Sequence, residues 1–445
     1  MSAPPQHAGD IRQLRRVALS GLLGSAVEFY DFLVYGSVAA LVFGDLFFPE
    51  ADPAVSTIAA LGTFAAGYVA RPLGGIVFGH FGDRLGRKAS MLWTMTLMGT
   101  GSLLIGLLPT YDVIGVWAPV LLVLLRVVQG IAIGGEWGGA TLMAAEHAGD
   151  RPRGRWTAFT QLGAPAGTLA STAVVTVVAT LPDEDFLSWG WRVPFLLSVV
   201  LLAIGLYVRV SVTESPLFRA EQPRGAARRR RPPVLDVLRR PRAVLLGAGV
   251  GIAPFAAQSV MTTFLIAYAT GHGYSRQQVL TGVTCAAAVA LVVLPLAAAA
   301  SDRWGRRPVV ALGALLSAAT AFPVFALVGS GRPGLLILAC VIGHGIAQSI
   351  MYGPLAALLT ELFGTRTRYT GASLGYQTAT LIGGGLSPLL AQSLAATYGG
   401  TTPVALLLLV AAALTVLAVW RLGETNRTSL SARTAVSPAE QGVAP

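Results

Sequence analysis

"GHFGDRLGRK", residues 79–88, recurs as "AAASDRWGRR", residues 298–307, at an offset of 219 residues. Two further groups repeat at offsets of 215 and 213: Gly130 and Glu146 match Gly345 and Glu361, and Arg153 and Arg155 match Arg366 and Arg368. Because three widely spaced anchors share nearly one offset, the sequence predicts a duplicated unit that forms two similar halves.

The composition indicates an integral membrane protein. Hydrophobic residues make up 54% of the 445 residues and charged residues 12%, whereas globular proteins carry about a quarter charged residues. Apolar runs of the roughly 20 residues that a bilayer requires recur along the chain. They predict twelve transmembrane helices, six in each half, at 17–43, 56–81, 89–109, 118–145, 156–181, 191–210, 243–268, 276–300, 309–329, 334–361, 370–397 and 402–422.

The positions of Lys and Arg predict the orientation, because loops that face the cytoplasm hold the excess of these residues. With the N-terminus inside, 27 of the 32 fall in cytoplasmic segments and two, Arg276 and Arg332, in outer loops. We expect a cytoplasmic tail at 1–16, one half at 17–210, a basic linker at 211–242 with a short amphipathic helix around 233–240, a second half at 243–422 and a cytoplasmic tail at 423–445. The net charge of +11 then reflects topology and implies no nucleic-acid partner.

Enzyme chemistry has little support in the sequence. Cys285 and Cys340 lie in predicted spans, and no zinc-ligand spacing, phosphate-binding glycine loop or Ser/His/Asp arrangement stands out. We therefore expect neither an enzyme nor a bound metal or cofactor.

Five charged residues fall within about 10 Å of the predicted bilayer midplane, at 1.5 Å of rise per residue: Glu28, Asp31, Arg71, Arg126 and Glu136. Charges at this depth are costly and indicate function by default. Two arginines compensate at most two of the three acids, so one acid is left to bind and release a proton. We predict that Asp31 and Glu28 form the proton-coupling pair. Asp31 is expected to carry the proton and Glu28 to pair in a gate, with a static Asp31–Arg71 bridge as the alternative.

The same spans offer groups for a polar substrate. Arg126 and Gln129 share one helix face and suit a carboxylate; Arg71 does the same, or it satisfies backbone carbonyls at a kink beside Pro72. Tyr30 and Tyr35 are expected to face the cavity. The second half, which lacks midplane charges, supplies polar groups at Gln258, His344, Gln348, Tyr352 and Gln377, of which His344, Gln348 and Tyr352 form one α-helical stripe. Arg192, beside "DEDF", is expected in a structural ion pair at the outer edge.

These features resemble the major facilitator superfamily and, within it, the metabolite:proton symporter family, whose members include shikimate, 2-oxoglutarate and proline/betaine transporters. The resemblance runs from about residue 17 to 422 and rests on "EFYDFLVYG", "ARPLGGIVFGHFGDRLGRK", "RVVQGIAIGGEWGGA", "WGWRVPFLLS", "SDRWGRRP" and "TELFGTRTRYTGASLGYQ". It implies secondary active transport by alternating access between two halves. The chain lacks the long heptad tail of the proline/betaine osmosensors.

Charged residues at the cytoplasmic ends of the spans predict gates. Acids at helix ends can pair with arginines and with helix N-termini, and the family resemblance implies that Asp83 forms such a latch. We expect two latches, with a looser second copy, and two clamps in which Glu146 pairs with Arg153 and Arg155 while Glu361 pairs with Arg366 and Arg368. The gating set is Asp83, Arg84, Arg87, Lys88, Glu136, Glu146, Arg153, Asp302, Arg303, Arg306, Glu361 and Arg366.

The resulting expectation is a monomeric, multi-pass protein of the plasma (inner) membrane, with both termini cytoplasmic, that carries a small carboxylate together with protons. It needs no cofactor, because the proton gradient drives transport. The alternatives are uptake of a zwitterionic osmolyte such as proline or betaine and, in a different class, a transport-inactive membrane sensor.

Overall fold

The computed structural model describes residues 9–85, 87–148, 152–210, 237, 239, 241–363 and 368–426. Within these ranges the chain is almost entirely helical and contains no strand. Twelve helices are long and apolar enough to span a membrane, and their limits agree with the predicted ones to within four residues. The prediction of an all-α protein with twelve spans is confirmed, whereas most of the predicted linker and its short helix lie outside the described residues.

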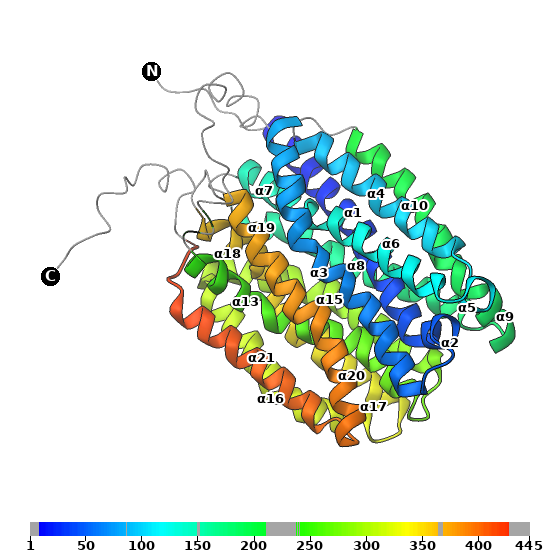
Figure 1. Cartoon of the computed structure of the whole chain (residues 1–445). Coiled ribbons are helices and arrows are strands. Elements are labelled where there is room, and N and C mark those ends of the chain that lie inside the picture. The colour runs from blue at the N-terminus through cyan, green and yellow to red at the C-terminus, as the bar shows by residue number, and fades with distance from the viewer. Residues whose placement is uncertain are drawn as a thin grey trace, which may run out of the picture.

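The first half contains six spans joined by short connections (Figure 1). They are α1 (Gly9–Val38) with η1 (Ala39–Phe43) and α2 (Gly44–Phe47), α3 (Pro53–Leu85), α4 (Arg87–Leu107), α6 (Trp117–Gly134) with α7 (Glu136–Ala148), α8 (Arg153–Val178) and α10 (Val193–Val210). Short turns α5 (Tyr111–Ile114), α9 (Asp183–Ser188) and η2 (Gly190–Arg192) connect them at one end of the bundle.

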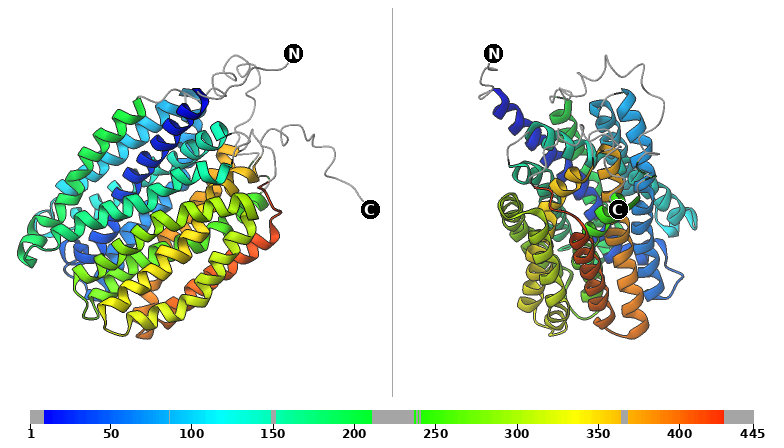
Figure 2. Two further views of the ribbon diagram at one scale, coloured as in Figure 1. Left: turned by 180° about the vertical axis from the view of Figure 1, so that it is seen from behind. Right: turned by 90° about the vertical axis from the view of Figure 1, so that its left-hand side faces the viewer.

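The second half repeats this arrangement. Its spans are α13 (Pro241–Ser259) with η3 (Val260–Phe264) and α14 (Leu265–Thr270), α15 (Arg276–Trp304), α16 (Arg306–Val328), α17 (Pro333–Cys340) with η4 (Val341–Gln348) and α18 (Ser349–Leu362), α19 (Arg368–Ala379) with η5 (Thr380–Leu386) and α20 (Ser387–Tyr398), and α21 (Thr402–Arg421). Figure 2 shows the blue-to-cyan helices and the yellow-to-red helices as two groups packed side by side.

The duplication is visible in how helices pack. A Cβ atom on Gly130 would lie 2.0 Å from the carbonyl oxygen of Gly67, and one on Gly345 would lie 3.0 Å from that of Ala286. Ala286 follows Gly67 at the 219-residue offset of the sequence repeat. Small residues therefore bring α6 close to α3, and η4 close to α15, through equivalent contacts, as is common between membrane helices.

Four spans contain a π-helical segment, and these segments are η1, η3, η4 and η5. η1 and η3 occupy matching places in the first span of each half. π-Helical hydrogen bonding runs from residue i to i+5 and is frequent at functional sites. These segments mark the spans where side chains depart from α-helical spacing.

We call the end of the bundle that carries Arg153, Asp302 and Glu361 the predicted cytoplasmic end, and the end that carries α5 and α9 the predicted outer end. In Figure 1, α7, α18 and α19 lie toward the first of these ends, and α2, α5 and α9 toward the second.

Candidate functional site

Two buried arginines and an aromatic ring form the centre of the first half. The guanidinium carbon of Arg71 lies 4.1 Å from the centre of the Phe32 ring, and that of Arg126 lies 4.0 Å from the same ring. Tyr68 contacts Arg71 at 4.1 Å, and Tyr35 contacts Arg126 at 3.8 Å. The aromatic faces stabilise both cations where water is scarce.

Arg126 has hydrogen-bonding capacity to spare. Its Nη1 donates to Gln129 Oε1 at 2.9 Å, and Gln129 Nε2 donates to Ser102 Oγ at 2.8 Å. Its Nε and Nη2 are buried without a hydrogen-bond acceptor among the described residues. Gly67 leaves room here, because a Cβ at that position would lie 3.3 Å from both nitrogens. The predicted contact between Arg126 and Gln129 is present, and the N–H groups on Nε and Nη2 of Arg126 have no protein acceptor among the described residues.

Asp31 lies beside this cluster and is buried. Its Oδ1 accepts a hydrogen bond from Ser198 on α10, and Ser102 also lies next to the carboxylate. Arg126 is close enough to act on Asp31 electrostatically. Within the part of the chain that the structure describes, neither Arg126 nor Arg71 forms an ion pair with Asp31. The alternative of a static Asp31–Arg71 bridge is therefore wrong for this conformation.

The two tyrosines near Asp31 play different structural parts. Tyr35 lies over Arg126, and its hydroxyl group is 2.5 Å from Thr63 Oγ1. Tyr30 donates to the backbone carbonyl of Pro194 at 2.9 Å. Tyr30 thus joins α1 to α10 instead of contacting the arginines, because residues i and i+5 on a helix point in different directions.

The other two midplane acids are also buried. Glu28 lies near Tyr68 of the first half and near Tyr352 and Tyr376 of the second half, toward the interface between halves. Glu136 begins α7, immediately after α6 ends at Gly134. Both positions suit the predicted gating roles, which stay predictions.

The helix break between α6 and α7 joins the two halves. The carbonyl of Gly134 accepts from Gln377 Nε2 at 3.2 Å, and that of Gly135 accepts from the Tyr369 hydroxyl at 2.8 Å. Gln377, which was predicted to bind substrate, therefore joins α19 to α6 through this hydrogen bond in this conformation. Glycines at the break leave these carbonyls accessible.

An aromatic cluster of which the sequence analysis named only Tyr352 lies nearby. Trp137 stacks on Tyr376 of the other half with ring centres 3.8 Å apart, and the Tyr376 hydroxyl lies 3.0 Å from that of Tyr352. Gln161 Oε1 accepts from Trp137 Nε1, and Gln161 Nε2 donates to the Tyr352 carbonyl. Trp137 within "GGEWGGA" was the available signal, since a bulky ring among glycines suggests a packing partner.

The remaining second-half residues lie on π-helical or adjoining segments. His344 and Gln348 belong to η4, and Gln258 lies at the end of α13 just before η3; all three are buried. The predicted stripe of His344, Gln348 and Tyr352 runs from the π-helical segment η4 into α18, and it stays a prediction.

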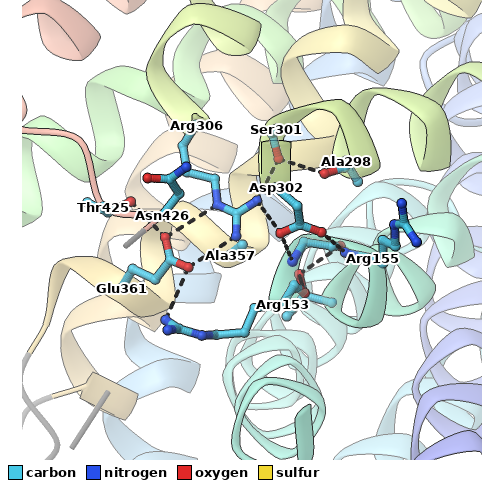
Figure 3. Close-up of polar contacts among 12 residues, drawn as sticks. Arg153, Arg155, Ala298, Ser301, Asp302, Arg306, Ala357, Glu361, Thr425 and Asn426 are labelled. Carbon is cyan, nitrogen blue, oxygen red and sulfur yellow. Dashed lines mark hydrogen bonds and ion pairs between the residues drawn. The ribbon is translucent and has the colours of Figure 1, made fainter. Parts of the chain in front are cut away.

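A buried ion cluster closes the predicted cytoplasmic end (Figure 3). Glu361 Oε1 lies 3.3 Å from Arg153 Nη1 of the first half and 3.2 Å from Arg306 Nη2. Arg368 Nε, in contrast, donates to the Phe363 carbonyl, and Arg366 lies outside the described residues. Glu361 thus forms an ion pair that crosses between halves, and the predicted clamp with Arg366 and Arg368 stays a prediction.

Asp302 makes a second cross-half contact. Its two oxygens accept from the backbone N–H groups of Gly154 and Arg155 at 2.8 and 3.0 Å, and Arg306 pairs with it at 2.8 Å (Figure 3). A carboxylate thus caps the N-terminus of α8, where N–H groups lack intrahelical partners and the helix dipole favours negative charge. Arg303 is exposed, and the side chains of Asp83, Arg84, Arg87 and Lys88 lie outside the described residues.

The segment after α21 also contacts this cluster. Thr425 Oγ1 donates to Glu361 Oε2 at 2.7 Å, and Glu424 accepts from the backbone N–H groups of Arg306 and Arg307. Burial raises the pKa of Glu424, but these N–H groups and those of Thr425 and Asn426 outweigh it and hold the pKa below its ordinary value of 4.5.

We expect Glu424→Gln to lower the melting temperature modestly at neutral pH. A depressed pKa means that the carboxylate stabilises the fold above its unfolded pKa and loses this effect as pH falls through the folded value. The difference between variant and wild type should therefore shrink as the pH falls below the ordinary pKa of 4.5. Differential scanning fluorimetry from pH 7 to 3.5 measures this, and a constant difference would contradict the assignment.

At the predicted outer end, the structure corrects one expectation. Arg192 donates to the carbonyls of Gly106 and Leu108 at 3.0 and 2.6 Å, so it holds the end of α4 and pairs with no acid among the described residues. Asp183 of "DEDF" pairs instead with Arg276 of the second half at 2.6 Å. The halves are thus in contact at both ends of the bundle.

Comparison with known proteins agrees with this architecture. The sequence profile of the Major Facilitator Superfamily matches residues 21–374 and 255–443. The inner membrane metabolite transport protein YhjE of Escherichia coli is 40% identical over 96% of this chain and 98% of its own length. The shikimate transporter of Escherichia coli is 39% identical over 89% and 91%, and the proline/betaine transporter of Salmonella typhimurium is 36% identical over 86% and 78%.

Solved structures show the same fold. The proton:xylose symporter XylE bound to 6-bromo-6-deoxy-D-glucose superimposes with a TM-score of 0.74 at 20% identity, covering 95% of this chain and 99% of that one. Relatives in sequence are transporters and not enzymes. The chain therefore belongs to the major facilitator superfamily of membrane transporters, in the group that includes metabolite, shikimate and proline/betaine transporters.

Proposed function

We propose that this protein is a proton-coupled symporter of a small organic acid, shikimate-like or another carboxylate, that works by alternating access. Arg126 and Arg71 attract the carboxylate, and Asp31 carries the proton. The protein lies in the plasma (inner) membrane with both termini cytoplasmic, as the distribution of Lys and Arg indicates.

The observation that carries the proposal is that buried Arg126, with N–H groups that lack an acceptor, lies near the buried carboxylate of Asp31. Arg126 Nε and Nη2 are buried without an acceptor among the described residues, and a planar guanidinium can hold a carboxylate through two parallel hydrogen bonds. Asp31 lies near enough for its charge to be felt at Arg126. An anion at Arg126 weakens the positive potential at Asp31, so substrate and proton binding favour each other.

A zwitterionic osmolyte is the second candidate. Proline/betaine transporters are 35–36% identical to this chain, and a zwitterion also carries a carboxylate for Arg126. The buried aromatic rings around the arginines could contact its cationic part, but both guanidinium groups already occupy positions over those rings. This occupancy favours an anion.

We expect Arg126→Lys to fold and to reach the membrane but to bind substrate more weakly by about 1.5–3 kcal/mol, the net value of a hydrogen bond to a charged group. The lysine ammonium keeps the charge but cannot reproduce the guanidinium fork. Isothermal titration of purified wild type and variant with shikimate and with its carboxamide measures the effect. If the wild type binds acid and amide equally, or the variant binds the acid unchanged, the carboxylate anchor is refuted.

A further inference from the structure

His344 has an unusual environment for a buried polar residue. Its side chain is 2% exposed, and neither Nδ1 nor Nε2 has a hydrogen-bond partner among the described residues. Buried side-chain polar atoms in proteins are nearly always hydrogen-bonded, and each exception requires an explanation. Packing alone does not favour histidine here, since an apolar residue of similar volume would avoid the loss of hydrogen bonds to water.

The internal repeat shows what the position does in the other half. Gly345 packs on α15 as Gly130 packs on α3, so His344, one residue before Gly345, is the counterpart of Gln129. Gln129 holds Arg126 and is itself held by Ser102. The counterpart of Arg126 in the second half is Val341. His344 therefore occupies the position whose counterpart accepts a hydrogen bond from an arginine, but the second half has no arginine at the matching position.

The segment that carries His344 lies one π-helical segment away from the first half. Its segment, η4, packs against η3, where a Cβ on Gly343 would lie 2.9 Å from Met261 Sδ. η3 in turn meets the first half, where a Cβ on Gly36 would lie 3.0 Å from Thr263 Oγ1. Gly36 adjoins Tyr35, the ring that covers Arg126. One π-helical segment thus separates the Arg126 cluster from the segment that carries His344.

We propose that His344 binds a hydroxyl group at the end of the substrate opposite its carboxylate, which makes the substrate a hydroxylated carboxylic acid. This inference rests on the proposed function. In its neutral form imidazole offers one N–H donor and one acceptor nitrogen, and a hydroxyl group can form a hydrogen bond with either one. A trimethylammonium group offers neither a donor nor an acceptor, so a betaine leaves both nitrogens unpaired.

The test uses two pairs of acids that share the carboxylate and differ in hydroxyl groups remote from it: shikimate with cyclohex-1-ene-1-carboxylate, and 4-hydroxybutyrate with butyrate. Affinities are measured by titration for the wild type, His344→Leu and His344→Gln. Glutamine, the residue at the equivalent position of the first half, keeps one donor and one acceptor. His272→Leu, which changes an exposed histidine at the predicted outer end, is the matched control.

In the wild type we expect a hydroxylated acid to bind about tenfold more tightly than its partner, the effect of one hydrogen bond. His344→Leu should abolish this preference and leave the affinity for the acid without hydroxyl groups unchanged, while His344→Gln and His272→Leu should retain it. Equal binding within both pairs, or a preference that survives in His344→Leu, overturns this inference alone. A wild type that binds none of the four acids overturns the proposed function and this inference with it.

Discussion

Asp31→Asn should abolish proton-driven accumulation of substrate and leave substrate exchange across the membrane intact. Asparagine resembles aspartate in shape and can still accept the hydrogen bond from Ser198 but cannot bind and release a proton. Exchange requires only that the loaded carrier reorients, whereas accumulation against a gradient requires that the proton is taken up on one side and released on the other.

Proteoliposomes allow both activities to be measured on one preparation. Accumulation is measured with an imposed pH gradient, and exchange is measured with labelled substrate outside and unlabelled substrate inside at equal pH. Asp45→Asn is the matched control, because Asp45 lies in the same span but is exposed. Wild-type accumulation by Asp31→Asn would show that another group carries the proton, and loss of both activities would show that Asp31 is needed to bind substrate or to fold.

Glu361→Gln should open the predicted cytoplasmic end and lower the stability of the protein. Glu361 is buried and pairs with Arg153 of one half and Arg306 of the other. Removing one partner of a buried ion pair costs about 3–5 kcal/mol, because the remaining charge loses its compensation. Since the Arg153 contact crosses between halves, part of this cost falls only on conformations that are closed at this end.

Spin labels at Leu19 and Trp420, exposed residues near the predicted cytoplasmic ends of the first and last spans, report the separation of the halves. They are introduced into a variant without Cys285 and Cys340. Double electron–electron resonance should show a longer mean distance between the two spin labels in Glu361→Gln than in the labelled protein that retains Glu361. Glu184→Gln, an exposed acid at the other end, should change neither the distance nor the melting temperature. An unchanged distance in Glu361→Gln would restrict the ion cluster to a role in folding.

The spans and their pairing into halves could be predicted because hydropathy and the repeat depend on local sequence. The contact between Arg126 and Gln129 was equally accessible, since residues three apart share a helix face. The contact between Glu361 and Arg153 was not accessible, because it depends on how the two halves meet. The sequence instead suggests Glu146 as the partner of Arg153, since the two residues are close along the chain.

The hydrophobic periodicity of the sequence could not predict two other features, which are the π-helical segment η4 and the position of Phe32. The segment that carries His344 and Gln348 is the π-helical η4 instead of an α-helix, and hydropathy does not signal such a segment. Phe32, which contacts both arginines, looks like any apolar residue of a membrane span. Its position became informative only once α1, α3 and α6 were placed together.

Proton movement that accompanies substrate entry tests coupled transport most directly. Proteoliposomes are held at equal internal and external pH with the membrane potential clamped at zero, shikimate or the best-binding acid of the titrations is added outside, and external pH is recorded. Protein-free liposomes correct for passive entry of the acid. Coupled symport predicts that external pH rises as the substrate enters, and that Asp31→Asn abolishes the rise. Substrate entry by the wild type with no rise in external pH would contradict proton-coupled symport.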